Sequence, residues 1–265
     1  MKRDFSAVRR IVVKVGTSTL TYAGGEVNLR RMELLTRVLS DLSNRGYSPV
    51  LVSSGAIGAG VSKLRLPARP ADVPGKQAAA AVGQCELMAL YDRFFSEYHH
   101  TVGQMLLTHQ VVDNEVLRIN ATNTLQALCA MDVIPIVNEN DTVAVEEIAF
   151  GDNDTLSAVV AGMADAQLLI LLTDIDGLYT ADPAKDPNAK RLDCVETLTD
   201  ELLAGASGAG TCRGTGGMQT KLAAAQIAAQ YGIPTVIASG EDPRILYDIL
   251  EGQNVGTLLF PDKRP

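Results

Sequence analysis

Two lysines stand next to small polar residues near opposite ends of the 265-residue chain. Lys14 lies inside the apolar run "IVVKV", where an ammonium group either snorkels from an edge strand or faces an anion. Gly16 and three hydroxyl residues follow it, and Lys221 closes the glycine-rich stretch "GTGGMQTK" before an expected helix. Because ammonium groups and the N–H groups of such turns both bind anions, these segments predict a site for a phosphate-bearing ligand.

Neither glycine-rich segment of the chain matches a common nucleotide fingerprint. The P-loop pattern places its lysine directly after a glycine, whereas Lys221 follows a threonine and precedes a leucine. The stretch "SSGAIGAG" reads G-x-x-G-x-G, the reverse of the dinucleotide pattern, so it gives little support to a dinucleotide cofactor. We expect Ser54 and Gly55 to face a ligand, while helix packing is enough to explain Gly58 and Gly60.

Asparagine and aspartate gather in two further segments, "NENDT" at residues 138–142 and "GDNDT" at residues 151–155. Asp152 or Asn153 can cap a helix that begins there, which is the structural explanation. The number of amide and acid side chains exceeds what capping needs. Amide groups can bind a carboxylate and an Asp can pair with an ammonium group, so the two segments favour an amino-acid ligand.

This combination of side chains favours phosphoryl transfer over hydride or acyl transfer. A phosphoryl group in transfer needs positive charge around its oxygens, which two lysines and the Mg²⁺ that accompanies a nucleotide supply. Mg²⁺ is often held by substrate phosphates and water, so we expect no dedicated metal site of protein side chains. The three histidines lie outside the glycine-rich turns, and a Ser-His-Asp arrangement is not indicated.

Alternating strands and helices must position these residues. Apolar runs without polar alternation, as at residues 168–172, are typical of strands covered on both faces of a parallel sheet. This alternation predicts an α/β sandwich whose ligand lies beyond the carboxyl ends of the strands. The expected strands are residues 11–15, 49–54, 101–107, 133–138, 168–174 and 233–239, and the expected helices are about 28–45, 74–98, 120–131, 153–164, 217–231 and 242–251.

Composition limits the class of protein. A chain with 46% hydrophobic residues can bury one large core, so a single domain is expected. A net charge of −8 argues against a nucleic-acid partner or an anionic membrane surface. The four cysteines are isolated, which favours reduced thiols, and no segment approaches the roughly 20 apolar residues of a membrane span. We therefore expect a cytoplasmic protein.

Seven motifs occur in an order that resembles the glutamate 5-kinases of the amino-acid kinase family. They are "IVVKVGTSTL", "VSSGAIGAG", "VGQMLLT", "VNEND", "GDNDTLSA", "LLTDIDGLYTADP" and "GTGGMQTK". The resemblance covers nearly the whole chain. It implies a three-layer αβα sandwich with a mainly parallel, about eight-stranded sheet. It also implies that residues 1–265 form a single amino-acid kinase domain, in the form without a C-terminal PUA-type domain.

The resemblance implies ATP-dependent phosphorylation of the L-glutamate side-chain carboxylate to L-glutamyl 5-phosphate, the first step of proline biosynthesis. Lys14 and Lys221 would neutralise charge on the phosphoryl group, and Asp154 would position both lysines. The implied substrate-binding residues are Ser54, Gly55, Asn138, Asp141 and Asn153. The implied nucleotide-binding residues are Lys14, Gly16, Thr173, Asp174, Thr215, Gly216, Gly217, Met218, Gln219, Thr220 and Lys221, with ATP and Mg²⁺ as cofactors.

The family also implies partners and leaves alternatives. We expect proline as a feedback inhibitor, a homo-oligomer, and passage of the product to a glutamyl phosphate reductase. A non-catalytic sensor of glutamate or proline on the same scaffold is one alternative. A related amino-acid kinase that forms another acyl phosphate is a second alternative.

Overall fold

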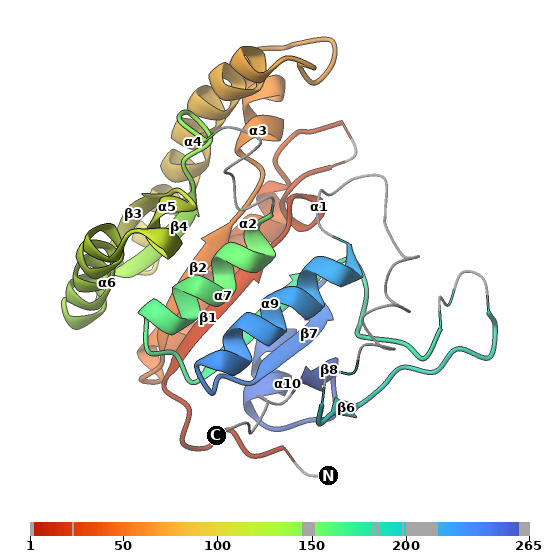
Figure 1. Cartoon of the computed structure of the whole chain (residues 1–265). Helices are drawn as coiled ribbons and strands as arrows, with labels where there is room; N and C mark the ends of the chain where they lie inside the picture. Colours follow the sequence, from red (N-terminus) through yellow and green to blue (C-terminus); the bar gives the residue numbers. More distant parts are fainter. Residues whose placement is uncertain are drawn as a thin grey trace.

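The computed structural model describes residues 3–22, 24–144, 152–181, 183, 186–197, 199 and 217–259. In it a single eight-stranded sheet lies between two layers of helices (Figure 1). The strands are β1 Arg10–Val15, β2 Ser48–Ser53, β3 Val102–Leu107, β4 Ile134–Glu139, β5 Leu168–Thr173, β6 Cys194–Val195, β7 Thr235–Ser239 and β8 Thr257–Leu259. The helices are α1 Thr17–Leu20, α2 Leu29–Asn44, α3 Ala56–Lys63, α4 Val73–Ser96, α5 Gln110–Asp113, α6 Glu115–Ala130, α7 Asn153–Met163, α9 Met218–Gln230 and α10 Ile245–Leu250.

The strand order across the sheet is β3-β4-β2-β1-β5-β7-β8-β6. Every neighbouring pair is parallel except β7 and β8, which are antiparallel. The predicted αβα sandwich with a mainly parallel, eight-stranded sheet is therefore confirmed.

The central strands divide the core into two halves. Strand β1 sends Val12 to one face, with side chains from α6, α7 and α9. Its neighbours Ile11 and Val13 face the other side, with side chains from α2, α4 and α10. Helices α7 and α9 lie side by side across the first face (Figure 1). Both faces of β1 and β5 are covered, which explains why these strands lack polar alternation in the sequence.

Local signals predicted some element ends better than others. The sequence predicts that Asn28 caps the start of the helix at about 28–45 and that Gly46 ends it. In the structure the side chain of Asn28 accepts a hydrogen bond from the Arg31 N–H at 3.1 Å, and Gly46 adopts a φ of 87° just after α2. Helix α6 begins earlier than predicted, because Asn114 caps it by accepting from the Leu117 N–H. The elements β6, β8, α1, α3 and α5 were not among the expected strands and helices.

The sequence also predicts a surface loop at residues 64–75 and turns with a small hairpin within residues 174–196. Residues 64–72 form an exposed connection, and Asp72 ends it by capping α4 through the Gly75 N–H. Tyr179 and Arg191 pair as an antiparallel bridge, which confirms a small hairpin after β5. Within the described part of the chain, no helix has the length and apolar character needed to cross a membrane.

Helices α3 and α4 pack backbone against backbone. A Cβ atom on Gly60 of α3 would lie 1.8 Å from the Ala79 carbonyl oxygen of α4. A Cβ atom on Gly83 of α4 would lie equally close to the carbonyl oxygen of Ala56. Helix packing therefore requires Gly60, as predicted, and requires Gly83 as well.

We expect Gly60→Ala to lower the free energy of unfolding by about 2 kcal/mol, because the added methyl group forces α3 and α4 apart. Gly58→Ala is the matched control, since its Cβ would meet only a side-chain atom, at 3.9 Å. The control should be neutral or stabilising, because Ala suits a helix interior better than Gly does. Urea denaturation of both variants measures the difference, and equal stabilities would contradict the packing argument.

Candidate functional site

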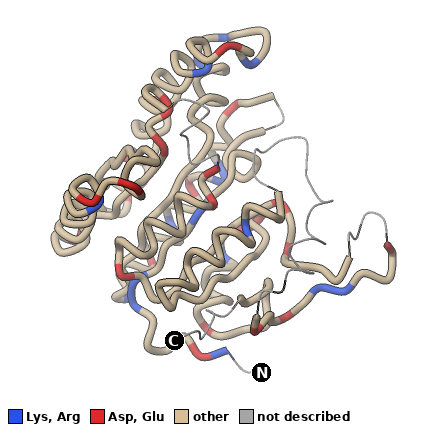
Figure 2. Tube along the Cα trace, in the orientation of Figure 1, with Lys and Arg blue, Asp and Glu red and all other residues tan. Residues whose placement is uncertain are grey.

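Strand β1 is the point at which the strand order reverses. The chain passes from β1 to β2 on one side, and β5 returns to the other side of β1. In parallel sheets, ligands bind beyond the carboxyl ends of the strands at such a point. Most charged residues lie away from the central strands, but a small group of both signs gathers near the starts of α7 and α9 (Figure 2). This edge of the sheet is the candidate site.

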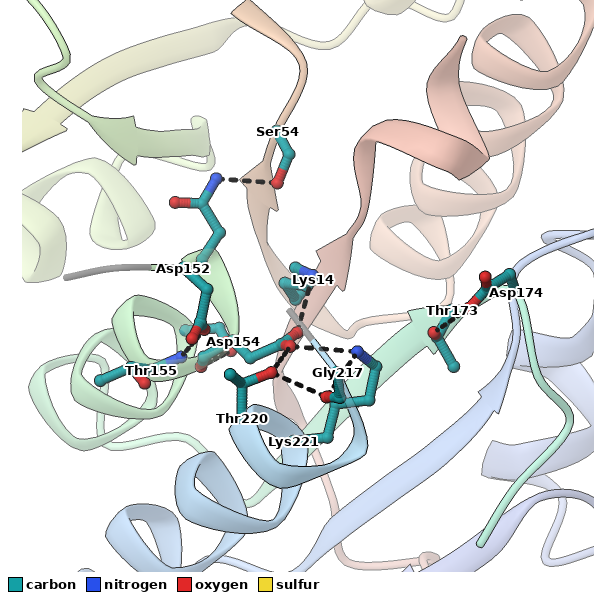
Figure 3. Close-up of polar contacts among 12 residues, drawn as sticks. Lys14, Ser54, Asp152, Asp154, Thr155, Thr173, Asp174, Gly217, Thr220 and Lys221 are labelled. Carbon is teal, nitrogen blue, oxygen red and sulfur yellow. Dashed lines mark hydrogen bonds and ion pairs between the residues drawn. The ribbon is translucent and has the colours of Figure 1, made fainter. Parts of the chain in front are cut away.

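Asp154 joins the two lysines at this edge (Figure 3). Its Oδ1 lies 2.7 Å from Lys14 Nζ, and its Oδ2 lies 3.2 Å from Lys221 Nζ. The side chain of Asp154 has no exposed surface, and those of Lys14 and Lys221 are 9% and 6% exposed. Lys14 comes from β1, Asp154 from α7 and Lys221 from α9, so the fold brings together three distant segments.

Two further interactions fix the ends of the helices that carry this cluster. The Thr220 hydroxyl lies 2.9 Å from Asp154 Oδ2 and 2.8 Å from the Gly217 carbonyl oxygen. Asp152 caps α7 by accepting from the Thr155 N–H at 2.8 Å. The starts of α7 and α9 therefore meet at the cluster, and their N–H groups favour negative charge there.

The electrostatics of the cluster favour an ionised Asp154. Burial alone would raise the pKa of its carboxyl group. Lys14 and Lys221, with hydrogen bonds from Lys14 and Thr220, outweigh burial and hold that pKa below its ordinary value. Two ammonium groups against one carboxylate leave these three side chains with an excess of positive charge. The cluster can therefore attract and stabilise an anionic group.

Amide side chains form a second group beside the cluster. Asn153 Nδ2 lies 2.8 Å from Ser54 Oγ, 2.8 Å from Asn138 Oδ1 and 2.9 Å from the Ser53 carbonyl oxygen. Asn138 Nδ2 donates to Gln84 Oε1 on α4 at 2.8 Å. Ser54, Asn138 and Asn153 were predicted substrate-binding residues, and the structure brings them together.

Gln84 was not a predicted site residue. The helix expected at about residues 74–98 carried no predicted site residue, and apart from Gly83 its sequence does not indicate that a glutamine reaches the sheet edge. The close glycine contact between α3 and α4 is the reason it does. The only usable signal is Gly83 next to Gln84, in a helix that otherwise favours alanine.

The remaining predicted substrate residues, Gly55 and Asp141, follow the ends of β2 and β4. Gly55 has a φ of 101°, which favours glycine, and directly precedes α3. Asp141 lies in the turn after β4 and is partly buried, and burial raises its pKa against the opposing effect of Arg69. Burial also raises the pKa of Asp152, although the Thr155 N–H opposes this.

The described members of the predicted nucleotide-binding set lie at the ends of β1 and β5 and at the start of α9. Gly16 precedes the short helix α1, and a Cβ atom there would lie 3.7 Å from Lys14 Nζ, so its backbone borders the ammonium group. Thr173 is buried at the end of β5 and donates to Asp174 Oδ1 at 2.9 Å, apart from the lysine cluster in Figure 3. Met218 packs into the core, whereas Gln219 is exposed. Thr215 and Gly216 lie outside the described residues.

A dedicated metal site is not seen in the residues described. No group of three or more His, Cys, Asp or Glu side chains among them has the arrangement to hold a metal ion. The cysteines described are unpaired: Cys85 is exposed, Cys129 is buried and Cys194 is intermediate.

Comparisons with known proteins agree with this geometry. Residues 9–239 match the sequence model of the Amino acid kinase family. The chain is 52% identical to a glutamate 5-kinase of Clostridium perfringens, covering 99% of both chains. It is 54% identical to a glutamate 5-kinase of Clostridium tetani, covering 97% of this chain and 96% of that one.

Solved structures share the fold at lower sequence identity. A carbamate kinase from Giardia lamblia, solved with AMP-PNP, superposes with a TM-score of 0.68 at 18% identity. The alignment covers 97% of this chain and 100% of that one. At this identity the likeness concerns the fold alone.

We expect Asp154→Asn to lower the free energy of unfolding by about 3 kcal/mol at neutral pH, because two buried ammonium groups lose their carboxylate. The folded-state pKa of Asp154 lies below the unfolded value, so its stabilisation is complete above about pH 4 and is lost as the pH falls further. Urea denaturation between pH 3 and 8 should therefore show a deficit that shrinks at the acid end.

The matched control is Asp132→Asn, which makes the same change at an exposed residue with a φ of 56° that Asn tolerates. Its effect should stay within about 0.5 kcal/mol at every pH. A deficit for Asp154→Asn that does not depend on pH would contradict the proposed charge state.

Proposed function

Because the chain belongs to the amino acid kinase family and its curated relatives are glutamate 5-kinases over nearly their full length, we propose that it phosphorylates the side-chain carboxylate of L-glutamate with ATP. The product is the acyl phosphate L-glutamyl 5-phosphate, with ADP as the second product. The observation that carries the proposal is the buried pair of lysines held by Asp154.

Phosphoryl transfer to a carboxylate needs charge stabilisation and no general base. A carboxylate oxygen of glutamate attacks the γ-phosphorus of ATP, and the bond between the γ-phosphorus and the β,γ-bridging oxygen breaks. The carboxylate has no proton to lose, so Asp154 is free to position the lysines. Lys14 and Lys221 neutralise negative charge on the oxygens of the phosphoryl group in transfer.

The charge of the site suits a nucleotide. Two ammonium groups and two helix N-termini meet at one point and match a triphosphate. We propose that Gly16, Thr173 and Asp174, together with residues 215–221, hold ATP. Mg²⁺ carried on the ATP phosphates supplies further positive charge to the transferring group.

The amide group suits the amino acid. Asn153 Nδ2 lies within hydrogen-bond distance of three oxygens, which takes up both of its N–H groups, so its Oδ1 is the atom that can accept from a ligand. We propose that this oxygen and Asp141 receive the ammonium group of glutamate, and that Ser54, Gly55 and Asn138 complete the pocket.

The proposal extends to regulation and partners. Proline shares the α-carboxylate and the amine of glutamate, so we propose that it inhibits by occupying the same amide pocket. We also propose a homo-oligomeric enzyme that works in the cytoplasm. An acyl phosphate hydrolyses readily, which supports its direct passage to a glutamyl phosphate reductase.

We expect the protein to form a hydroxamate when incubated with Mg²⁺, ATP, L-glutamate and hydroxylamine, because hydroxylamine traps an acyl phosphate. The measurement is the colour of the ferric hydroxamate complex, with ADP release as a second readout. The matched controls replace glutamate with aspartate or N-acetylglutamate. Product from either of these, with none from glutamate, would indicate a related amino-acid kinase, and binding of glutamate or proline without turnover would indicate a sensor.

We expect Lys221→Ala to lower kcat by about 100-fold or more, because it removes a preorganised charge at the transition state. The chain should still fold, since Lys14 remains beside Asp154. Steady-state kinetics with both substrates measure the effect.

Lys190→Ala provides the control, because Lys190 is exposed and lies in the hairpin after β5, where its backbone N–H donates to the Thr180 hydroxyl. Its kcat should match that of the unmodified protein. A near-normal kcat for Lys221→Ala would remove Lys221 from the catalytic role.

A further inference from the structure

Gln84 contacts the asparagine side chains of the proposed amino-acid pocket from α4, a helix outside the predicted site. Its Oε1 accepts from Asn138 Nδ2 at 2.8 Å, and Asn138 is only 3% exposed. A buried amide N–H without an acceptor destabilises the folded state, so this hydrogen bond holds the Asn138 side chain in one orientation. Gln84 therefore supplies the acceptor for Asn138 from α4.

Backbone groups fix the orientation of both asparagine amides. The Glu139 N–H can only donate, and it lies 2.9 Å from Asn138 Oδ1. The Ser53 carbonyl can only accept, and it lies 2.9 Å from Asn153 Nδ2. Asn138 must therefore turn Nδ2 toward α4, and the side chain that meets it there must present an acceptor. Gln84 does so.

The position of Gln84 is set by its neighbour in the sequence. Gly83 lies so close to α3 that a Cβ atom would collide with the Ala56 carbonyl oxygen. Ala56 begins α3, two residues after Ser54. The same backbone contact therefore places Gln84 beside Asn138 and fixes α4 relative to the turn that carries Ser54.

We propose that Gln84 is a positioning residue for the amino-acid substrate, acting through Asn138 and Asn153. The inference rests on the proposed function, in which these asparagines bind glutamate. Loss of the acceptor at residue 84 leaves Asn138 Nδ2 unpaired. The Asn138 side chain can then rotate, and the hydrogen bond that orients Asn153 Oδ1 toward the ligand is weakened. The charges that serve the chemical step are held by the ion pairs of Asp154 with Lys14 and Lys221, in which neither Gln84 nor Asn138 takes part, so the chemical step is preserved.

The test is Gln84→Met, which keeps the length of the side chain and removes the acceptor. We expect the KM for glutamate to rise about tenfold, with kcat and the KM for ATP within about twofold of the unmodified values. Gln230→Met makes the same change at an exposed residue near the end of α9 and should leave all three parameters unchanged. Gln84→Ala, which suits a helix interior, should show the same split.

A double-mutant cycle with Asn138→Ala tests whether Gln84 acts through Asn138. In the Asn138→Ala background, Gln84→Met should change the KM for glutamate by less than about twofold, because the bond is already lost. Multiplicative effects, or an unchanged KM in both single variants at residue 84, would overturn the inference. A loss of thermal stability with an unchanged KM would give Gln84 a purely structural role and would also overturn it.

The inference and the proposed function fail in different ways. If the unmodified protein forms no hydroxamate from glutamate, the proposed function is wrong. If it does so and Gln84→Met behaves like Gln230→Met, only the role of Gln84 is wrong.

Discussion

A carboxylate without exposed surface, that of Asp154, holds two ammonium groups at the carboxyl-terminal edge of the sheet. A lysine inside a central strand is unfavourable unless an anion compensates it, and Asp154 compensates Lys14. The start of α7 adds to this, because a helix N-terminus stabilises a carboxylate in its first turn. The same carboxylate links β1, α7 and α9, so the charge cluster and the packing of the central helices depend on one another.

The contact between α3 and α4 has the same role for the amide group. Glycine at positions 60 and 83 lets two helix backbones meet where any side chain would separate them. This approach fixes the turn that carries Ser54 and the helix that carries Gln84 as one unit. Polar groups that bind a small ligand must be held within a fraction of an ångström, and a backbone contact gives less freedom than interdigitated side chains do.

The features of this architecture that could be predicted from the sequence are those that depend on neighbouring residues or on the order of strands and helices along the chain. The cap at Asn28 is local chemistry, and the sandwich follows from alternating apolar runs and helices. The two lysines were expected at one polar edge of the sheet because ligands of parallel sheets bind beyond the carboxyl ends of the strands. The role of Asp154 between them was implied by the resemblance to the glutamate 5-kinases, and the structure places its carboxylate against both ammonium groups.

Other features were not predictable, for physical reasons. Strands β6 and β8 have two and three residues, too few for any periodic pattern, and tertiary pairing defines them. Gln84 sits on a helix whose sequence shows only a packing surface, and its contact depends on how closely α4 approaches α3. The distance between two helices depends on the side chains of both, so it cannot be read from the sequence of one helix alone.

The peptide between Asn153 and Asp154 joins the two groups of the site. Asn153 points to the amide group and Asp154 to the lysines, and both stand in the first turn of α7, which Asp152 caps. Consecutive Cα atoms are about 3.8 Å apart, so the proposed amino-acid pocket and the phosphoryl-stabilising charges cannot drift independently. In a transfer reaction much of the rate comes from holding the two reacting groups in a fixed relation. A single helix start that carries both sets of contacts provides that relation through the backbone itself.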